Sequence, residues 1–65
     1  MAILNGIKKL RLAKDVTQEQ LAAAVGVSRQ TIVAIEKGNY TPSLMLAMQL
    51  ARFFKVSVEE LFRIQ

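Results

Sequence analysis

The chain has 65 residues, so it forms one domain, residues 1–65, near the lower size at which a hydrophobic core holds a fold unaided. It contains no Cys and no His, which excludes disulfides, thiol nucleophiles, imidazole acid/base catalysis and the usual zinc sites. We therefore expect no enzyme, no metal and no cofactor. Nine Lys and Arg against five Asp and Glu give a net charge of +4, which favours a polyanionic partner, although such charge also serves solubility.

Membrane association is not expected. No run approaches the roughly 18 apolar residues that cross a bilayer. The opening stretch MAILNG is too short for a signal peptide and lacks its basic front. We expect a soluble, cytoplasmic protein, with which the absence of Cys is compatible.

The two ends of the chain carry short apolar stretches, AILN (residues 2–5) and LFRIQ (residues 61–65). Such stretches are either frayed helix ends or two short strands that pair with each other. We favour the paired strands, which would close the fold as a small ribbon.

The first predicted helix starts at Ile7, because Ile7, Leu10, Arg11 and Lys14 follow the spacing of one helix face. Arg11 is unexpected on an apolar face. A second helix follows from Thr17, which forms a capping box with the residue three positions later. It should bury three apolar positions: Leu21, Ala22 and Val25.

A third helix follows after a very short turn. Gly26 supplies the positive φ that ends the second helix, and Ser28 caps a third helix that runs to Lys37. A connection of three or four residues is typical of a helix-turn-helix motif. Gly38 closes the third helix, and Pro42 presets the φ of the first turn of the next one.

Two further helices complete the predicted set of five. Helical spacing returns between Ser43 and Phe54, with the apolar positions Leu46, Ala47, Leu50, Ala51 and Phe54. Ser57 and Glu60 form a second capping box, which opens a short fifth helix through Leu61.

The third helix has two unlike sides. One side carries Ile32, Ile35 and Glu36, and the other carries Arg29, Gln30, Val33, Ala34 and Lys37. In a helix-turn-helix motif the second helix lies in the major groove of DNA and its first residues meet the base edges. Gln pairs with adenine, Arg with guanine, and Val or Ala meets the methyl group of thymine. A merely solvated helix face is the alternative.

Further donors flank this helix in the sequence. Gln18 begins the second helix, where a side chain and the helix dipole together bind a phosphate. Asn39, Tyr40 and Thr41 follow the third helix and offer donors to the DNA backbone. The combination favours double-stranded DNA as the partner.

The segment TQEQLAAAVGVSRQTIVAIEKGNYTPSLMLAMQLARFFKVSVEELF resembles the helix-turn-helix family of phage Cro and cI-type repressors, the xenobiotic response element class. The resemblance runs from about Ile7 to Phe62, and TQEQLA, GVSRQTI and IEKG are its most specific parts. It implies an all-α, five-helix, lambda-repressor-like fold. SRQTI and NYTPSL also resemble a group of very small bacterial regulators made of little besides this domain.

The resemblance implies roles for individual residues. Gln18 would contact a phosphate; the major groove would be met by Ser28, Arg29, Gln30, Thr31 and Val33 or Ala34; the flanking DNA backbone by Lys37, Asn39 and Tyr40. Arg11 would form a structural ion pair with Glu36, with a phosphate contact as its alternative role. No sensor domain is recognisable, so the resemblance implies no small-molecule ligand.

A homodimer is expected, because a single module buries only about 600 to 1,000 Å² on DNA. Hydrophobic residues make up 52% of the chain, more than so small a domain easily hides. The expected excess is Phe53, Phe62, Ile64, Met45 and Met48, with at least one of the two methionines filling the core. We place the two-fold contact on the fifth helix and the C-terminus, at Leu61, Phe62 and Ile64.

The sequence thus predicts a sequence-specific transcriptional regulator, most simply a repressor that occupies an operator. The alternative is an antitoxin-like module that sequesters a partner protein and regulates its own expression. The two differ in whether a stable protein partner copurifies.

Overall fold

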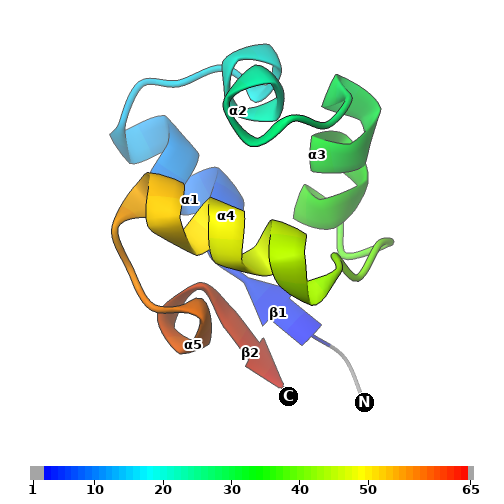
Figure 1. The fold of residues 1–65 in the computed structure, drawn as a ribbon, viewed down its shortest axis with the longest axis vertical. Helices are drawn as coiled ribbons and strands as arrows, with labels where there is room; N and C mark the ends of the chain where they lie inside the picture. The colour runs from blue at the N-terminus through cyan, green and yellow to red at the C-terminus, as the bar shows by residue number, and fades with distance from the viewer. Residues whose placement is uncertain (1–2, 65) are drawn as a thin grey trace.

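A computed structural model describes residues 3–64 of the chain. The elements in chain order are β1 (Ile3–Asn5), α1 (Ile7–Ala13), α2 (Gln18–Val25), α3 (Arg29–Glu36), α4 (Leu44–Phe54), α5 (Val58–Leu61) and β2 (Phe62–Ile64). Figure 1 shows α1, α2 and α3 arranged around α4, with α5 and the two strands together at the end away from α2. The predicted five-helix fold with a terminal ribbon is confirmed.

The two strands form an antiparallel pair that joins the ends of the domain. Their register sets Ile3 opposite Ile64, Leu4 opposite Arg63 and Asn5 opposite Phe62. Residues 2 and 65 of the predicted stretches lie outside the described part of the chain. Leu61 is the last residue of α5 and not part of the strand.

Four helices begin at a hydroxyl cap. In each case the side-chain oxygen accepts a hydrogen bond from the backbone N–H three residues on; the caps are Thr17, Ser28, Ser43 and Ser57. The predicted capping boxes of α2 and α5 are both present. In the second box, hydrogen bonds from the backbone N–H and the hydroxyl of Ser57 lower the pKa of Glu60. Local sequence therefore sets where these helices start.

The helix ends follow the prediction only in part. Gly26 and Gly38 have the expected positive φ, at 74° and 79°. Lys55, which ends α4, and Asp15, which follows α1, also adopt left-handed φ values of 58° although neither is glycine. Pro42 precedes the cap Ser43, so it lies outside α4, and its predicted place in the first helical turn was wrong.

One apolar core joins all five helices. Its buried members are Ile7, Leu21, Ala22, Val25, Ile32, Ile35, Leu46, Leu50, Ala51, Phe54 and Leu61. Every apolar position predicted to be buried on α2, α3 and α4 is buried. Within residues 3–64 no buried side-chain nitrogen or oxygen lacks a hydrogen-bond partner.

Two predictions about apolar side chains were wrong. Leu61 is only 1% exposed, because it packs into the core of its own chain, so its side chain is not available for a two-fold contact. Met45 and Met48 are 71% and 57% exposed, so neither fills the core. The reason is the helical period, since Leu46 and Leu50 already occupy the inward side of α4 and both methionines fall outside it.

The helices are short. The longest of those described, α4, has 11 residues, and none is long and apolar enough to cross a membrane.

Candidate nucleic-acid interface

Helices α2 and α3 are joined by residues 26–28 and held at a fixed angle by shared core contacts. Leu21 and Val25 of α2 are buried in the same cluster as Ile32 of α3. In the turn, the backbone N–H of Val27 donates to the carbonyl oxygen of Ala22 at 3.0 Å, and the Val27 side chain packs against the core. The short connection and its apolar anchor leave the turn little freedom.

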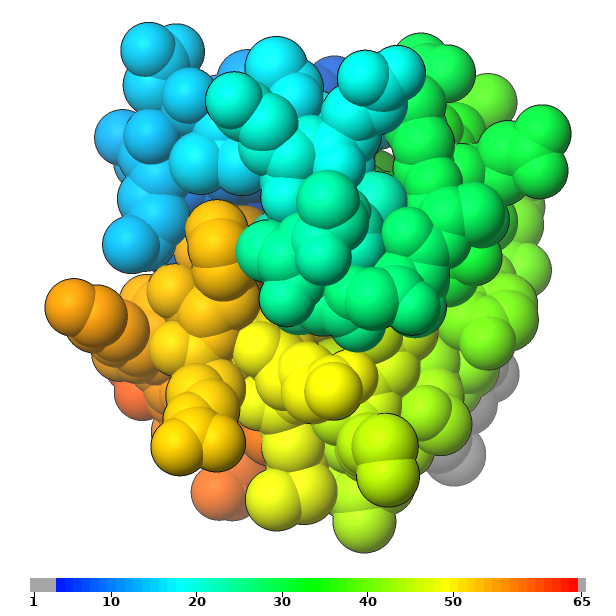
Figure 2. All heavy atoms as spheres, turned by 45° about the horizontal axis from the view of Figure 1, so that its top comes forward, coloured from blue at the N-terminus to red at the C-terminus, as the bar shows by residue number. Residues whose placement is uncertain are grey.

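The first turn of α3 points its polar side chains outward. Ile32 and Ile35 are 0% exposed, whereas Arg29 and Gln30 are exposed. In Figure 2 the atoms of α3 form an edge of the molecule beside α2, and no other element covers that edge. The sequence prediction of an apolar rear and a polar front therefore matches the burial of these side chains.

Ser28 and Thr31 are joined at the start of α3. The Ser28 hydroxyl oxygen accepts from the backbone N–H of Thr31 at 3.2 Å, and the two hydroxyl oxygens lie 3.0 Å apart. Ser28 is exposed and Thr31 half-buried. We call Ser28, Arg29, Gln30 and Thr31 the front of α3.

The remaining predicted DNA-contacting residues lie along or beyond α3. Val33 and Ala34 are half-buried, and Lys37, Asn39 and Tyr40 are exposed. The backbone N–H of Asn39 donates to the carbonyl oxygen of Ala34 at 2.9 Å, which ties the following loop to the helix. Tyr40 and Thr31 line one shallow hollow together, so the loop after α3 returns towards its front.

A buried ion pair holds the rear of α3 to α1. Arg11 Nε donates to Glu36 Oε2 at 2.7 Å and Arg11 Nη2 to Glu36 Oε1 at 3.2 Å, while Nη1 donates to the carbonyl oxygen of Val16 at 2.9 Å. The two side chains are 10% and 5% exposed. The hydrogen bond that Arg11 donates to Glu36 raises the pKa of Arg11, burial lowers it, and the Glu36 charge raises it further. The structure thus contains the pair that the resemblance implies, with the guanidinium directed inward.

Gln18 also contacts this ion pair, and the sequence did not predict that contact. Its Nε2 donates to Glu36 Oε1 at 3.1 Å from the first residue of α2. One carboxylate therefore receives donors from α1 and α2 while it belongs to α3. No spacing rule pointed to this contact, because Gln18 and Glu36 are distant in sequence and meet only in the fold.

Asn5 is a second residue that sequence reasoning missed. Its Nδ2 donates to the carbonyl oxygen of Ile35 at 2.9 Å, near the end of α3. Its Oδ1 accepts from the backbone N–H of Ile7, the first residue of α1, at 3.2 Å. Asn5 thus links the ribbon to both helices and holds the C-terminal end of α3, opposite to its front.

A hollow lies where α1, α2 and α3 meet. It measures about 580 Å³, and its lining includes Lys8, Thr17, Gln18 and Arg29, together with the acidic Asp15 and Glu19. Gln18 and Arg29 are therefore brought to one concave surface from two helices. A helix N-terminus and cationic side chains on such a surface suit a phosphate group.

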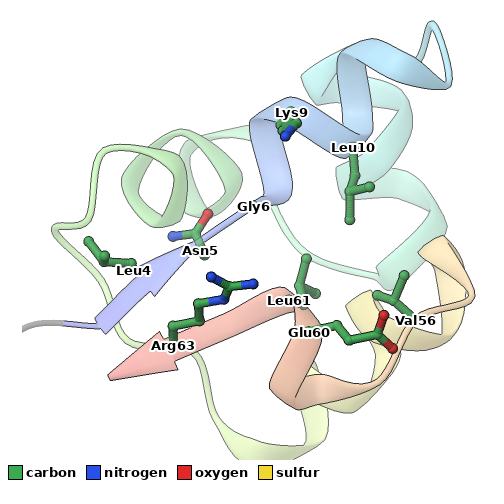
Figure 3. A pocket seen from close by; sticks show the side chains of 9 residues that line it. All are labelled: Leu4, Asn5, Gly6, Lys9, Leu10, Val56, Glu60, Leu61 and Arg63. Carbon is green, nitrogen blue, oxygen red and sulfur yellow. The ribbon is translucent and has the colours of Figure 1, made fainter. Parts of the chain in front are cut away.

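A second hollow lies on the other side of α1. Figure 3 shows it between the ribbon, α1 and α5, with Lys9 and Arg63 around an apolar floor that includes Leu10 and Leu61. Its volume is about 450 Å³. Glu60 also lines it, so the two cations there are partly balanced. Neither hollow holds a metal-ligand set, since no group of three acidic, His or Cys side chains is found in residues 3–64.

Two capped helices joined by a short turn, the second with its polar front exposed and its rear locked, define a helix-turn-helix DNA-binding domain. The helix-turn-helix family model matches residues 7–61. The chain belongs to the Cro/cI-type family of helix-turn-helix transcriptional regulators. This confirms the resemblance, and the family is a class of regulators, not of enzymes.

Known proteins with similar sequences or structures support this family assignment. An HTH-type transcriptional regulator of Methanocaldococcus jannaschii is 55% identical over 58 residues, which cover 89% of this chain and 88% of its own. The transcriptional repressor RstR of the cryptic phage CTXphi, from Vibrio cholerae, is 40% identical over 55 residues, 85% of this chain and 50% of its own. The restriction-modification controller protein C.AhdI of Aeromonas hydrophila superposes with a TM-score of 0.76 at 31% identity, covering 83% of this chain and 82% of its own.

Proposed function

We propose that this regulator represses transcription by binding a two-fold symmetric operator as a homodimer. The proposal rests on the two sides of α3: the front is exposed to solvent, whereas Ile32 and Ile35 on the opposite side are fully buried. Arg29 and Gln30 extend outward from the first turn, where a recognition helix meets base edges. Their side chains have the donor and acceptor geometry for guanine and adenine, which supports direct reading of sequence.

Gln18 would bind a phosphate without leaving the ion pair. A primary amide has two N–H donors, and the structure uses one of them on Glu36. The second, together with the N-terminal dipole of α2, suits a DNA phosphate. The cluster of Arg11, Gln18 and Glu36 would then fix the position of α3 relative to the DNA backbone.

The other side of the groove would be held by residues at and beyond the end of α3. Lys37, Asn39 and Tyr40 are exposed and can donate to phosphate oxygens. Val33 and Ala34 present partly exposed methyl groups that suit thymine. These contacts would set the register in which the front of α3 meets the bases.

Repression and the dimer rest on two further arguments. The relative RstR is named as a transcriptional repressor, and this chain is 40% identical to it over 55 residues. A single module buries about 600 to 1,000 Å² on DNA, whereas a dimer reads two half-sites about 34 to 36 Å apart. The protein would act in the cytoplasm, where its operator DNA would lie.

Selection of bound duplexes from a random pool tests this function. We expect a consensus with two-fold symmetry and half-sites about one helical turn apart. Enrichment of no sequence would contradict the proposal. A stable complex with another protein, purified together with the chain and binding no selected duplex, would favour the antitoxin-like alternative.

A further inference from the structure

Helix α4 presents an apolar side to water. Leu44, Met45 and Met48 are 73%, 71% and 57% exposed, and we call these three residues the α4 face. They line a groove of about 740 Å³ together with Ala51, Val56 and Val58. Large apolar side chains gathered in this way mark a binding surface more often than chance exposure does.

We propose that the α4 face is the two-fold contact of the homodimer, with a second copy of this chain as its occupant. This inference rests on the proposed function and replaces the C-terminal contact predicted from the sequence. A two-fold contact requires a surface that complements itself. The α4 face suits this requirement, because its exposed, flexible methionines form part of the groove and can pack against the same groove of a second copy.

The charges beside the groove also suit a second copy. Arg52 lines it, and the acidic Glu59 directly follows Val58, another lining residue. Both charged residues are exposed. A two-fold axis through the face would allow Arg52 of each copy to approach Glu59 of the other, so the charges suit a second copy.

The position of the face agrees with binding to one DNA site. Met45 and Gln49 of α4 line a shallow hollow together with Thr31 of α3 and Tyr40. Figure 2 shows α2, α3 and α4 on one side of the molecule, with α4 side chains projecting below the turn between α2 and α3. A second copy at α4 therefore lies next to the surface that presents the front of α3.

The C-terminal ribbon is a poorer contact. Ile64 is 74% exposed, but Leu61 is buried and Phe62 is half-buried against the core of its own chain. Figure 1 shows the ribbon at the end of the molecule away from α2. A contact there would hold the copies by fewer apolar side chains and farther from the helix-turn-helix motif.

Sedimentation of two charged variants of the full chain tests the proposal. We expect the parent to form dimers at tens of micromolar, Met48→Glu to weaken self-association at least tenfold, and Ile64→Glu to leave it unchanged. Ile64, 74% exposed against 57% for Met48, is the control, because it is an exposed apolar residue at the other candidate contact. A monomeric parent, or dissociation by Ile64→Glu alone, would overturn the assignment.

Folding and DNA binding complete the experiment. Circular dichroism should give the parental helix content for Met48→Glu, and Met45→Glu serves as the second variant if Met48→Glu fails to fold. Met48→Glu should bind a single half-site as the parent does and lose the parent's preference for a duplex with two half-sites. A parent that dimerises through α4 but binds no selected duplex would contradict the proposed function and leave this contact standing.

Discussion

Helices α3 and α4 have similar starts and rears but opposite fronts. Each begins at a serine cap, Ser28 or Ser43, that accepts from the backbone three residues on, and each buries an apolar side in the common core. The outward side of α3 begins with Arg29 and Gln30, whereas that of α4 carries Leu44, Met45 and Met48. The rear of a helix thus determines its place in the fold, and the front determines what it can bind.

The two helices also differ in how they are held. The buried residues of α4 are all apolar. Helix α3 has apolar anchors as well, but Glu36 accepts from Arg11 and Gln18, and the Ile35 carbonyl accepts from Asn5. Hydrogen bonds are directional, while apolar contacts are not. The added polar contacts therefore fix the orientation of α3, as base reading requires.

The largest effect should follow from breaking the polar lock of α3. Glu36→Ala leaves Arg11 buried without its carboxylate and should lower the free energy of unfolding by about 3 kcal/mol. Urea unfolding measures this loss. The exposed Glu19→Ala is the control and should cost a few tenths of a kcal/mol, roughly the size of a helix-dipole contribution. Equal stability of Glu36→Ala and the parent would refute the role of the pair.

The next effect concerns the front of α3. Arg29→Ala and Gln30→Ala should each weaken binding to the selected operator by about 1 to 3 kcal/mol and relax the base preference. Gln18→Ala should instead weaken binding to random duplexes as well as to the selected operator, because a phosphate carries no sequence information. Titration of both duplexes at one salt concentration measures the difference. Equal effects of all three variants on both duplexes would show that the base readers are wrongly assigned.

A smaller loss of stability is expected at the serine caps of α3 and α4, and only one of the two caps should also affect DNA binding. Ser28→Ala and Ser43→Ala each remove a hydroxyl that accepts from the backbone and should each cost about 1 kcal/mol of stability. Only Ser28→Ala should also weaken operator binding, because Ser28 belongs to the front of α3. Thermal unfolding and operator titration of both variants give the two values. Equal operator affinities would place Ser28 outside the interface.

The smallest effect on stability is expected from substitutions in the α4 face. Met45→Gln and Leu44→Gln should each change the stability of the monomer by less than about 0.5 kcal/mol, because neither side chain packs in the core. The measurement is made at a concentration where the parent sediments as a monomer. A loss comparable to that of a core truncation would mean that these side chains support the fold and do not form a separate surface.

Much of the fold was predictable because its signals are local. Thr17 with Gln20 and Ser57 with Glu60 form capping boxes within one helical turn, and Gly26 adopts the φ that its residue type favours. The left-handed Lys55 was not predictable in this way, and Asp15 carries only a weak signal of a positive φ. Each is followed by a valine, Val16 or Val56, which packs against the core and whose backbone N–H donates to a helix carbonyl oxygen.

From the residues alone, the candidate site was predictable only where it depends on one helix, and the Arg11–Glu36 pair between two helices was expected only from the family resemblance. The outward position of Arg29 and Gln30 follows from the helical period. Gln18 was expected to face DNA only, and its bond to Glu36 appears only once α2 and α3 are folded together. Asn5 had no predicted role, because its partner Ile35 lies thirty residues away.

The sequence by itself determined where each helix begins, which side of it is apolar and which family the chain resembles, since these depend on residues within a turn or two of one another. Tertiary structure alone decided that Leu61 is buried and that Asn5 and Gln18 hold α3. The physical reason is that burial and hydrogen bonding between distant residues depend on how the helices pack. No local pattern records that arrangement.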